Sequence, residues 1–210
     1  NYAPSKTIGG SFNLTLLDTA ERRVTASLTA GRVMPKSSSD TSIYSTVGLK
    51  FKQIIDLTQN ITFSVASSSV NTLANSTSDP TNSSISASYS KNLDVLKING
   101  GVQFTDRKSK TASFSGTDRN VFFEVKYLME SHDVYAKFSH TESSDDVKRT
   151  TQAAVRKQTS QFYEVGYSMP IPVTDLAKLT FYTNRLDANS NMALFKSQTT
   201  SFGAKVSLTF

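Results

Sequence analysis

The chain has 210 residues, of which 37% are apolar, a net charge of +6 and no cysteine. The lack of cysteine excludes a disulfide scaffold and a thiolate metal site. The basic residues are scattered and form no dense run, so no nucleic-acid-binding arm is expected. No apolar stretch approaches the roughly 18 residues of a membrane-spanning helix. The apolar content is low for a soluble core, but it suffices where one face of each strand meets lipid and the other is wet.

Alternation of apolar and polar residues with a period of two predicts a succession of β-strands, and helical periodicity is nearly absent. The first predicted strand, residues 8–16, places Ile8, Phe12, Leu14 and Leu16 on one face. Ten further alternating segments follow, at residues 23–30, 43–52, 61–66, 85–89, 96–104, 121–129, 134–139, 163–169, 178–184 and 201–210.

The predicted connections alternate between short and long. The short ones are residues 18–21, 56–60, 91–94, 130–133 and 173–176, and the long ones are residues 34–42, 67–84, 106–119, 141–161 and 187–198. This rhythm is typical of a meander with tight turns at one rim and free loops at the other. We therefore predict an all-β fold, an antiparallel up-and-down transmembrane β-barrel of about 11–12 strands, in one domain over residues 1–210. The competing interpretation is a β-sandwich, in which the rhythm is not required.

The final segment, "SFGAKVSLTF", resembles the last strand of bacterial outer-membrane β-barrel proteins. In that family a closing strand that ends in an aromatic residue is the usual signal for the barrel-assembly machinery. The matching residues are Phe202, Ala204, Val206, Leu208 and Phe210, and the predicted assembly signal is Phe202, Val206, Leu208 and Phe210. The resemblance implies a bacterial outer-membrane location. It also implies contact with outer-membrane lipid and lipopolysaccharide, the barrel-assembly machinery, and periplasmic or outer-membrane assembly partners.

Outward aromatic and methionine side chains are expected in belts at the two membrane interfaces, and Tyr127, Met129, Tyr163 and Tyr167 have the outward phase. If the chain ends at the periplasmic rim, both its last and its first predicted strand descend. Bacterial single-chain barrels usually have an even number of strands with both ends inside. Our hypothesis is therefore that the chain lacks the first strand or an N-terminal region of its barrel, or is part of a larger barrel.

The polar face of the predicted strands is rich in cations. Its basic residues are Arg23, Lys50, Lys52, Lys97, Lys126, Lys137, Lys178 and Lys205, and its acidic residues are Glu124 and Glu164. A charged ring biases the sign of permeating solutes, so a basic lumen favours anions or acidic polymers. The alternative is that these lysines keep a packed, wet interior soluble and pair with the two glutamates. A barrel of this size lies between filled and open ones.

Catalysis is not expected. The two histidines, His132 and His140, fall in a tight turn and on the apolar phase, and the chain has no GxSxG motif. We predict no metal site and no cofactor. The expected function is a porin or the exit duct of a secretion or polymer-export system. The alternatives are a non-conducting outer-membrane anchor for a larger assembly and a soluble β-sandwich adhesin. The basic residues of the predicted loop 141–161, Lys148, Arg149, Arg156 and Lys157, are candidates for contact with lipid phosphates or for a solvated loop.

Overall fold

The computed structural model describes residues 5–35, 42–72, 80–109, 115–148, 154–171 and 174–208. Eleven strands and one short 3-10 turn account for most of them, and the strand count matches the prediction. The elements are β1 (Ser5–Asp18), β2 (Arg22–Pro35), β3 (Ser42–Ile54), β4 (Gln59–Thr72), β5 (Pro80–Leu93), β6 (Leu96–Ser109), β7 (Gly116–Leu128), β8 (Asp133–Asp145), β9 (Lys157–Ile171), β10 (Thr174–Ser190), η2 (Ala193–Phe195) and β11 (Ser197–Leu208).

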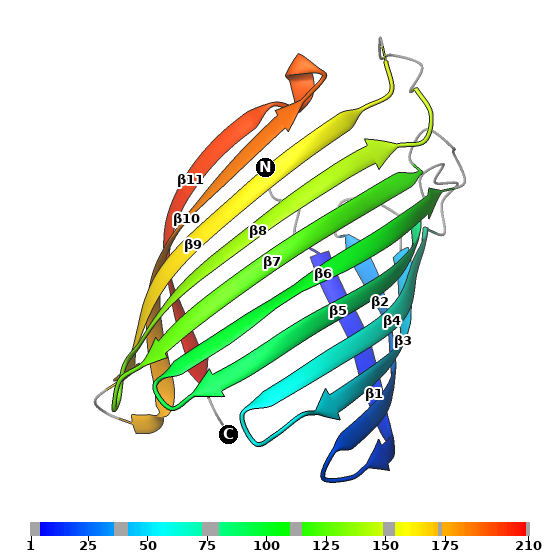
Figure 1. Cartoon of the computed structure of the whole chain (residues 1–210). Helices are drawn as coiled ribbons and strands as arrows, with labels where there is room; N and C mark the ends of the chain where they lie inside the picture. Colours follow the sequence, from blue (N-terminus) through cyan, green and yellow to red (C-terminus); the bar gives the residue numbers. More distant parts are fainter. Residues whose placement is uncertain are drawn as a thin grey trace.

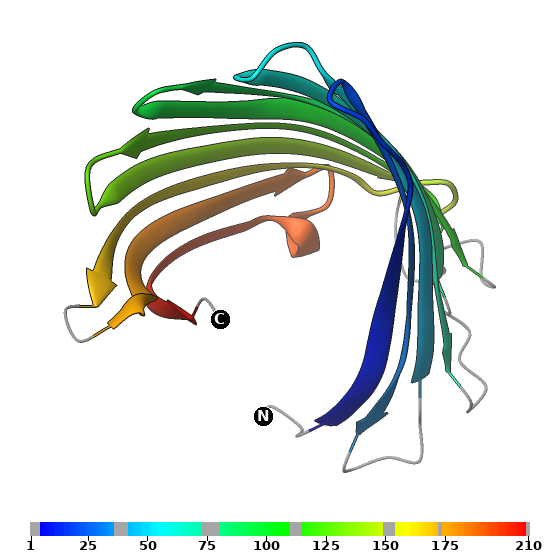
Figure 2. The ribbon, with the colours of Figure 1, turned by 90° about the horizontal axis from the view of Figure 1, so that it is seen from below.

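All eleven strands belong to one antiparallel sheet whose spatial order is the sequence order. The sheet curls into a deep trough, and β1 and β11 face each other across its open side (Figures 1 and 2). A single curved layer differs from the two stacked sheets of a β-sandwich. The up-and-down order and the strand number agree with the predicted barrel, but the sheet is not closed.

Short and long connections alternate as predicted, which defines two rims. At the short-turn rim, the described turns include the two-residue turn after Leu93, where Asp94 has a φ of 36°. In the turn after β3, the Thr58 hydroxyl and backbone N–H both donate to Asp56 Oδ1 at 2.7 Å. These hydrogen bonds lower the pKa of the Asp56 carboxyl, so their stabilisation exists above its ordinary pKa and is lost as the pH falls through the folded value.

At the long-connection rim, the strands are longer than predicted and the loops are shorter. Strand β4 continues to Thr72, β8 to Asp145 and β10 to Ser190, inside segments predicted to be loops. The outward positions there are Ser, Asn or charged, so the outer face of these strand ends is polar. Apolar alternation, the signal used for the prediction, is therefore missing where the backbone pairing continues.

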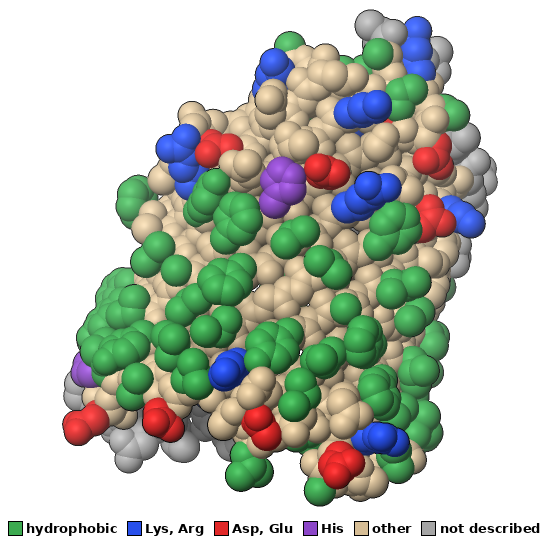
Figure 3. Space-filling model, viewed as in Figure 1, with side chains coloured by type: hydrophobic (Ala, Val, Ile, Leu, Met, Phe, Trp, Pro, Cys, Tyr) green, Lys and Arg blue, Asp and Glu red, His purple; other side chains and the backbone are tan. Residues whose placement is uncertain are grey.

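No hydrophobic core fills the trough. Ala177 is the one apolar side chain in the described part of the chain that is buried, whereas large apolar groups such as Phe12 and Phe202 are 62% and 81% exposed. Most of these groups lie on the convex face of the sheet (Figure 3). A β-bulge between Thr15 and Leu17 leaves Leu16 unpaired, so Leu17 takes the facing position predicted for Leu16. No helix among the described residues is long and apolar enough to cross a membrane.

Candidate functional site

The apolar residues of the convex face form a continuous belt that crosses the strands obliquely. Its upper boundary passes through Ile8 on β1, Phe104 on β6 and Phe202 on β11. Above Phe104 the next outward residue is Asp106, and above Phe202 it is Thr200. The lower boundary moves in the same direction, so the belt keeps a nearly constant height while the sheet turns.

The obliquity of the belt can be measured from the strand register. When the pairing is followed from β1 to β11 over ten strand-to-strand steps, Phe202 lies about six rungs below the level of Ile8. One rung is the distance along a strand between successive residues on the same face. With about 6.6 Å per rung and about 4.8 Å between strands, the strands are tilted by about 40° from the normal to the belt. Closed barrels have strand tilts of about 35–45°.

The height of the belt follows from the same geometry. On β6 it extends from Leu96 to Phe104, which is about 27 Å along the strand. At a tilt of about 40° this corresponds to a height of about 21 Å, close to the roughly 25 Å apolar band of membrane barrels. In Figure 3 charged groups lie above this band, toward the long-connection rim, and along its lower edge.

Tyrosines mark both boundaries of the belt. The Tyr163 hydroxyl donates to Gln161 Oε1 at 2.9 Å on the upper side, whereas the Tyr89 hydroxyl donates to Gln59 Oε1 at 2.7 Å on the lower side. The Tyr167 hydroxyl lies 2.7 Å from His132 Nδ1, also on the lower side. Each ring stays within the apolar belt while its hydroxyl reaches a polar partner outside it, which is how tyrosine behaves at a boundary between apolar and wet surroundings. The four predicted belt residues are exposed, namely Tyr127, Met129, Tyr163 and Tyr167.

The strand register places every predicted lumen residue on the concave face. These are the basic residues Arg23, Lys50, Lys52, Lys97, Lys126, Lys137, Lys178 and Lys205, and the acidic residues Glu124 and Glu164. Four of them lie within two residues of a strand end at the short-turn rim, and Lys178 contacts Asp133, the first residue of β8, at the same rim. We call this group the basic rim; it consists of Arg23, Lys52, Lys97, Lys126 and Lys178.

Aspartates that were not among the predicted lumen residues neutralise part of this charge. Asp133 at the start of β8 is 2% exposed and accepts contacts from Lys178 and, at 3.1 Å, from Lys126. Asp18 lies 3.0 Å from Arg23 in an exposed pair. Lys137 pairs with Glu164 at 3.2 Å, as one of the two lumen interpretations predicts. Among the described residues, the remaining predicted cations form no ion pair, namely Lys50, Lys52, Lys97 and Lys205.

Aromatic rings of the concave face lie flat against the wall. Tyr135 and Gly166 are directly paired across β8 and β9, and a methyl group on Gly166 would overlap the Tyr135 ring. Across β6 and β7, a methyl group on Gly101 would lie 2.8 Å from Phe122 Cζ. Two further directly paired positions repeat this arrangement, Tyr44 with Gly31 and Tyr182 with Gly203. Because each ring occupies the space above a glycine, it extends along the sheet and not across the trough.

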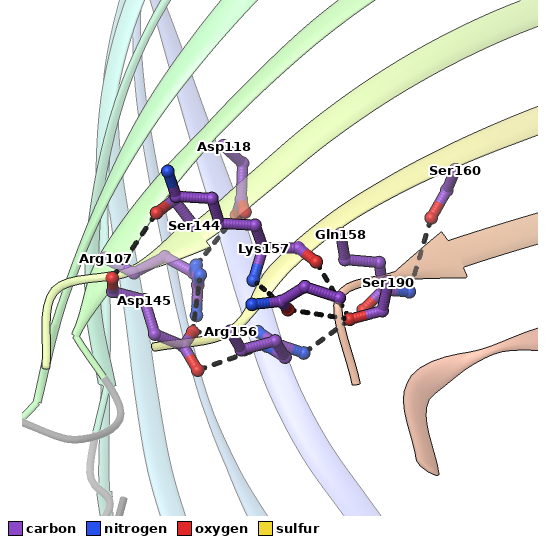
Figure 4. A network of polar contacts seen from close by, with 10 residues as sticks. Arg107, Asp118, Ser144, Asp145, Arg156, Lys157, Gln158, Ser160 and Ser190 are labelled. Carbon is purple, nitrogen blue, oxygen red and sulfur yellow. Dashed lines mark hydrogen bonds and ion pairs between the residues drawn. The ribbon is translucent and has the colours of Figure 1, made fainter. Parts of the chain in front are cut away.

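A charged network ties the strand ends together at the long-connection rim (Figure 4). Arg156 binds Asp145 through two contacts, Nε–Oδ2 at 3.1 Å and Nη2–Oδ1 at 2.9 Å. Arg107 lies 3.4 Å from the same carboxylate and 2.9 Å from Asp118, the latter as an ion pair outside hydrogen-bond geometry. The Arg156 guanidinium also lies 5.1 Å from the centre of the Phe195 ring. Arg156 was predicted as a loop cation; in the structure it links β8 to the η2 turn.

Among the described residues, neither histidine forms a hydrogen bond with a serine side chain. His140 is on the convex face, 3.7 Å from Glu142, whereas Ser139 and Ser143 are on the concave face. No cluster of three or more His, Asp or Glu residues in the described part of the chain suits a metal ion. Of the predicted assembly signal, Phe202 and Val206 are exposed on β11, Leu208 ends that strand, and Phe210 lies outside the described residues, as does Arg149 of the loop.

Comparisons with protein-family models, curated proteins and solved structures found no match to this chain. What can be stated of its class is an all-β protein built on one curved, up-and-down antiparallel sheet.

Proposed function

We propose that this chain forms the wall of a bacterial outer-membrane β-barrel that acts as a porin or as the exit duct of a secretion or polymer-export system. The observation that supports the membrane location is the oblique apolar belt. A protein partner could cover an apolar face of any outline. A lipid bilayer requires boundaries that stay at one height on every tilted strand, and aromatic residues such as these tyrosines typically collect at both boundaries.

The proposal includes closure of the sheet by one additional strand. Unpaired backbone groups at β1 and β11 would be costly in lipid, where no water can satisfy them. Both edge strands run from the long-connection rim to the short-turn rim, because the order is up-and-down and the strand number is odd. A single strand of the opposite direction can therefore pair antiparallel with both. Twelve strands about 4.8 Å apart with a tilt of about 40° enclose a backbone diameter of about 24 Å.

The concave face supports conduction of anionic solutes. The rings paired with glycines leave the middle of the trough free of their bulk, and the concave positions of β4 and β5 are mainly Ser and Thr. The basic rim would place positive charge at the short-turn mouth. By the family resemblance this mouth faces the periplasm. Such a ring favours anions or acidic polymers. We propose no catalytic activity for this chain.

Single-channel recording of the purified protein in planar bilayers tests this function. We expect steady steps with anion selectivity, and we expect Lys52→Glu with Lys97→Glu to reduce or reverse that selectivity. Lys52→Glu alone is compared with the control Lys108→Glu, which makes the same change of charge at an exposed position on the convex face at the opposite rim. A bilayer-inserted protein that produces no steps would favour the non-conducting anchor.

A further inference from the structure

A polar pocket opens at the long-connection rim, next to the upper boundary of the apolar belt. It has a volume of about 740 Å³ and is lined by the upper ends of β7 to β10 and by the η2 turn. Three of its lining residues are cations, Arg119 on β7, Lys157 on β9 and Lys196 after η2, and one is an anion, Glu142. The pocket therefore has an excess of positive charge.

The three cations are available to a ligand. All three are exposed, and none forms an ion pair with another described residue. Glu142 is turned toward His140, whose Nε2 lies 3.7 Å from the Glu142 carboxylate. By contrast, the neighbouring Arg156 and Arg107 form ion pairs with Asp145 and Asp118. Both arginines belong to the network of Figure 4.

The walls of the pocket are held in place before any ligand arrives. Asn191 donates to the Val155 carbonyl at 2.8 Å and accepts the Lys157 backbone N–H at 2.9 Å. The Ser190 hydroxyl donates to the Lys157 carbonyl at 2.8 Å. These bonds join the start of β9 to the end of β10 and fix the backbone of Lys157. The Lys196 backbone N–H donates to the Ala193 carbonyl at 3.1 Å. A preorganised site loses less entropy on binding.

The height of the pocket indicates the type of ligand. Arg119 is the first outward residue above Val121, the last apolar residue of the belt on β7. In a bilayer this is the level at which acyl chains end and phosphate groups begin. Arginine and lysine bind phosphate by charge-assisted contacts. The volume is in the range of pockets for drug-sized molecules, which leaves room for a sugar or glycerol next to the phosphate.

From this geometry we infer that the pocket binds the phosphate group of a lipid headgroup through Arg119, Lys157 and Lys196. This inference rests on the proposed membrane location. It assigns to the chain a bound lipid at the long-connection side, distinct from the basic rim at the opposite mouth. Each contact removed is expected to weaken retention of the lipid by about tenfold, since a hydrogen bond to a charged group contributes that much.

The test measures lipid retained by the protein after reconstitution into phosphatidylcholine vesicles containing lipid A, a phosphorylated glycolipid, followed by detergent extraction and mass spectrometry. We expect retention by the wild type and its loss in the triple variant Arg119→Gln, Lys157→Gln and Lys196→Gln. The matched control carries the same loss of charge on the concave face, as Lys50→Gln, Lys52→Gln and Lys97→Gln. We expect this control to retain the lipid.

Three outcomes would overturn the inference. They are retention by the triple variant, equal loss in the control, and displacement of the lipid by millimolar inorganic phosphate, which would indicate a site for the free ion. Insertion into vesicles is scored separately by gel mobility with and without boiling, so a protein that does not insert refutes the proposed function instead. If the triple variant fails to fold, Lys196→Gln alone, which lies outside the strands, is expected to lower retention about tenfold.

Discussion

An arginine in the middle of the apolar belt should destabilise the protein in a membrane and should be tolerated above the belt. Val165 is an outward residue of β9, 53% exposed, with Tyr163 above it and Tyr167 below it. Val165→Arg therefore places a charge near mid-height. Thr159→Arg is the matched control, because Thr159 is on the same strand and the same face, about 20 Å farther along it.

The expected magnitudes follow from this geometry. With strands tilted by about 40°, the two positions differ in height by about 15 Å, which is more than the distance of about 10 Å from the middle of the belt to its edge. Arginine on the lipid face of a barrel costs about 2–4 kcal/mol at the midplane and about 0–1 kcal/mol near an interface. In water, an exposed valine replaced by arginine would change the free energy of unfolding by less than about 0.5 kcal/mol.

The measurement is urea unfolding of the protein in vesicles, followed by the loss of the unboiled gel mobility of the folded form. A difference of about 2–3 kcal/mol between Val165→Arg and Thr159→Arg is expected. Equal free energies of unfolding for the two variants, or a stable wild type in buffer without detergent or lipid, would refute the assignment of the belt to a membrane.

Three other predictions concern the wall itself. Gly166→Ala should lower the free energy of unfolding, measured by urea titration, by about 1–3 kcal/mol, because the added methyl group meets the Tyr135 ring. Gly10→Ala has open space around it and should leave the free energy of unfolding unchanged. Equal effects of the two changes would show that the Tyr135 ring does not lie over Gly166. Asp145→Asn should lower the free energy of unfolding by about 3–5 kcal/mol, because Arg156 and Arg107 would lose the charge of a fully buried carboxylate. Limited proteolysis between β8 and β9 should become faster. Unchanged stability would mean that solvent compensates both arginines. With one strand between β1 and β11, Ser11→Cys combined in turn with Lys205→Cys and Ser207→Cys should give no disulfide. Strands separated by one intervening strand are about 9.6 Å apart, and a disulfide needs Cα atoms within about 7 Å. The chain has no other cysteine, so a cross-link would establish direct pairing of β1 with β11.

The division of residues between the two faces could be predicted from the sequence, because successive side chains of a strand point to opposite faces and counting along one strand assigns them. Lys97 and Val102 are assigned to opposite faces by counting alone, and the structure confirms both. The alternation of short and long connections was predicted from the spacing between the alternating segments. The strand ends beyond the belt were predicted wrongly as loops, because outward serine and threonine carry no apolar signal.

The ion pairs of the concave face could be predicted only in part. Glu164 and Lys137 were identified from their phase, but Asp133 was assigned to a turn, and its two lysines are on β7 and β10. Asp145 and Arg156 are 11 residues apart in a segment predicted to be a loop. Their association depends on where β8 ends and β9 begins, which the alternation pattern does not specify.

By itself, the sequence determined that this protein is all-β, that its strands follow one another up and down, and which side chains share a face, because each of these properties depends on neighbours one or two residues away. The tertiary structure decided the register between strands, and with it the oblique belt, the rings over glycines and the pocket with its three free cations. Register is set by contacts between residues from different strands, so no local pattern contains it.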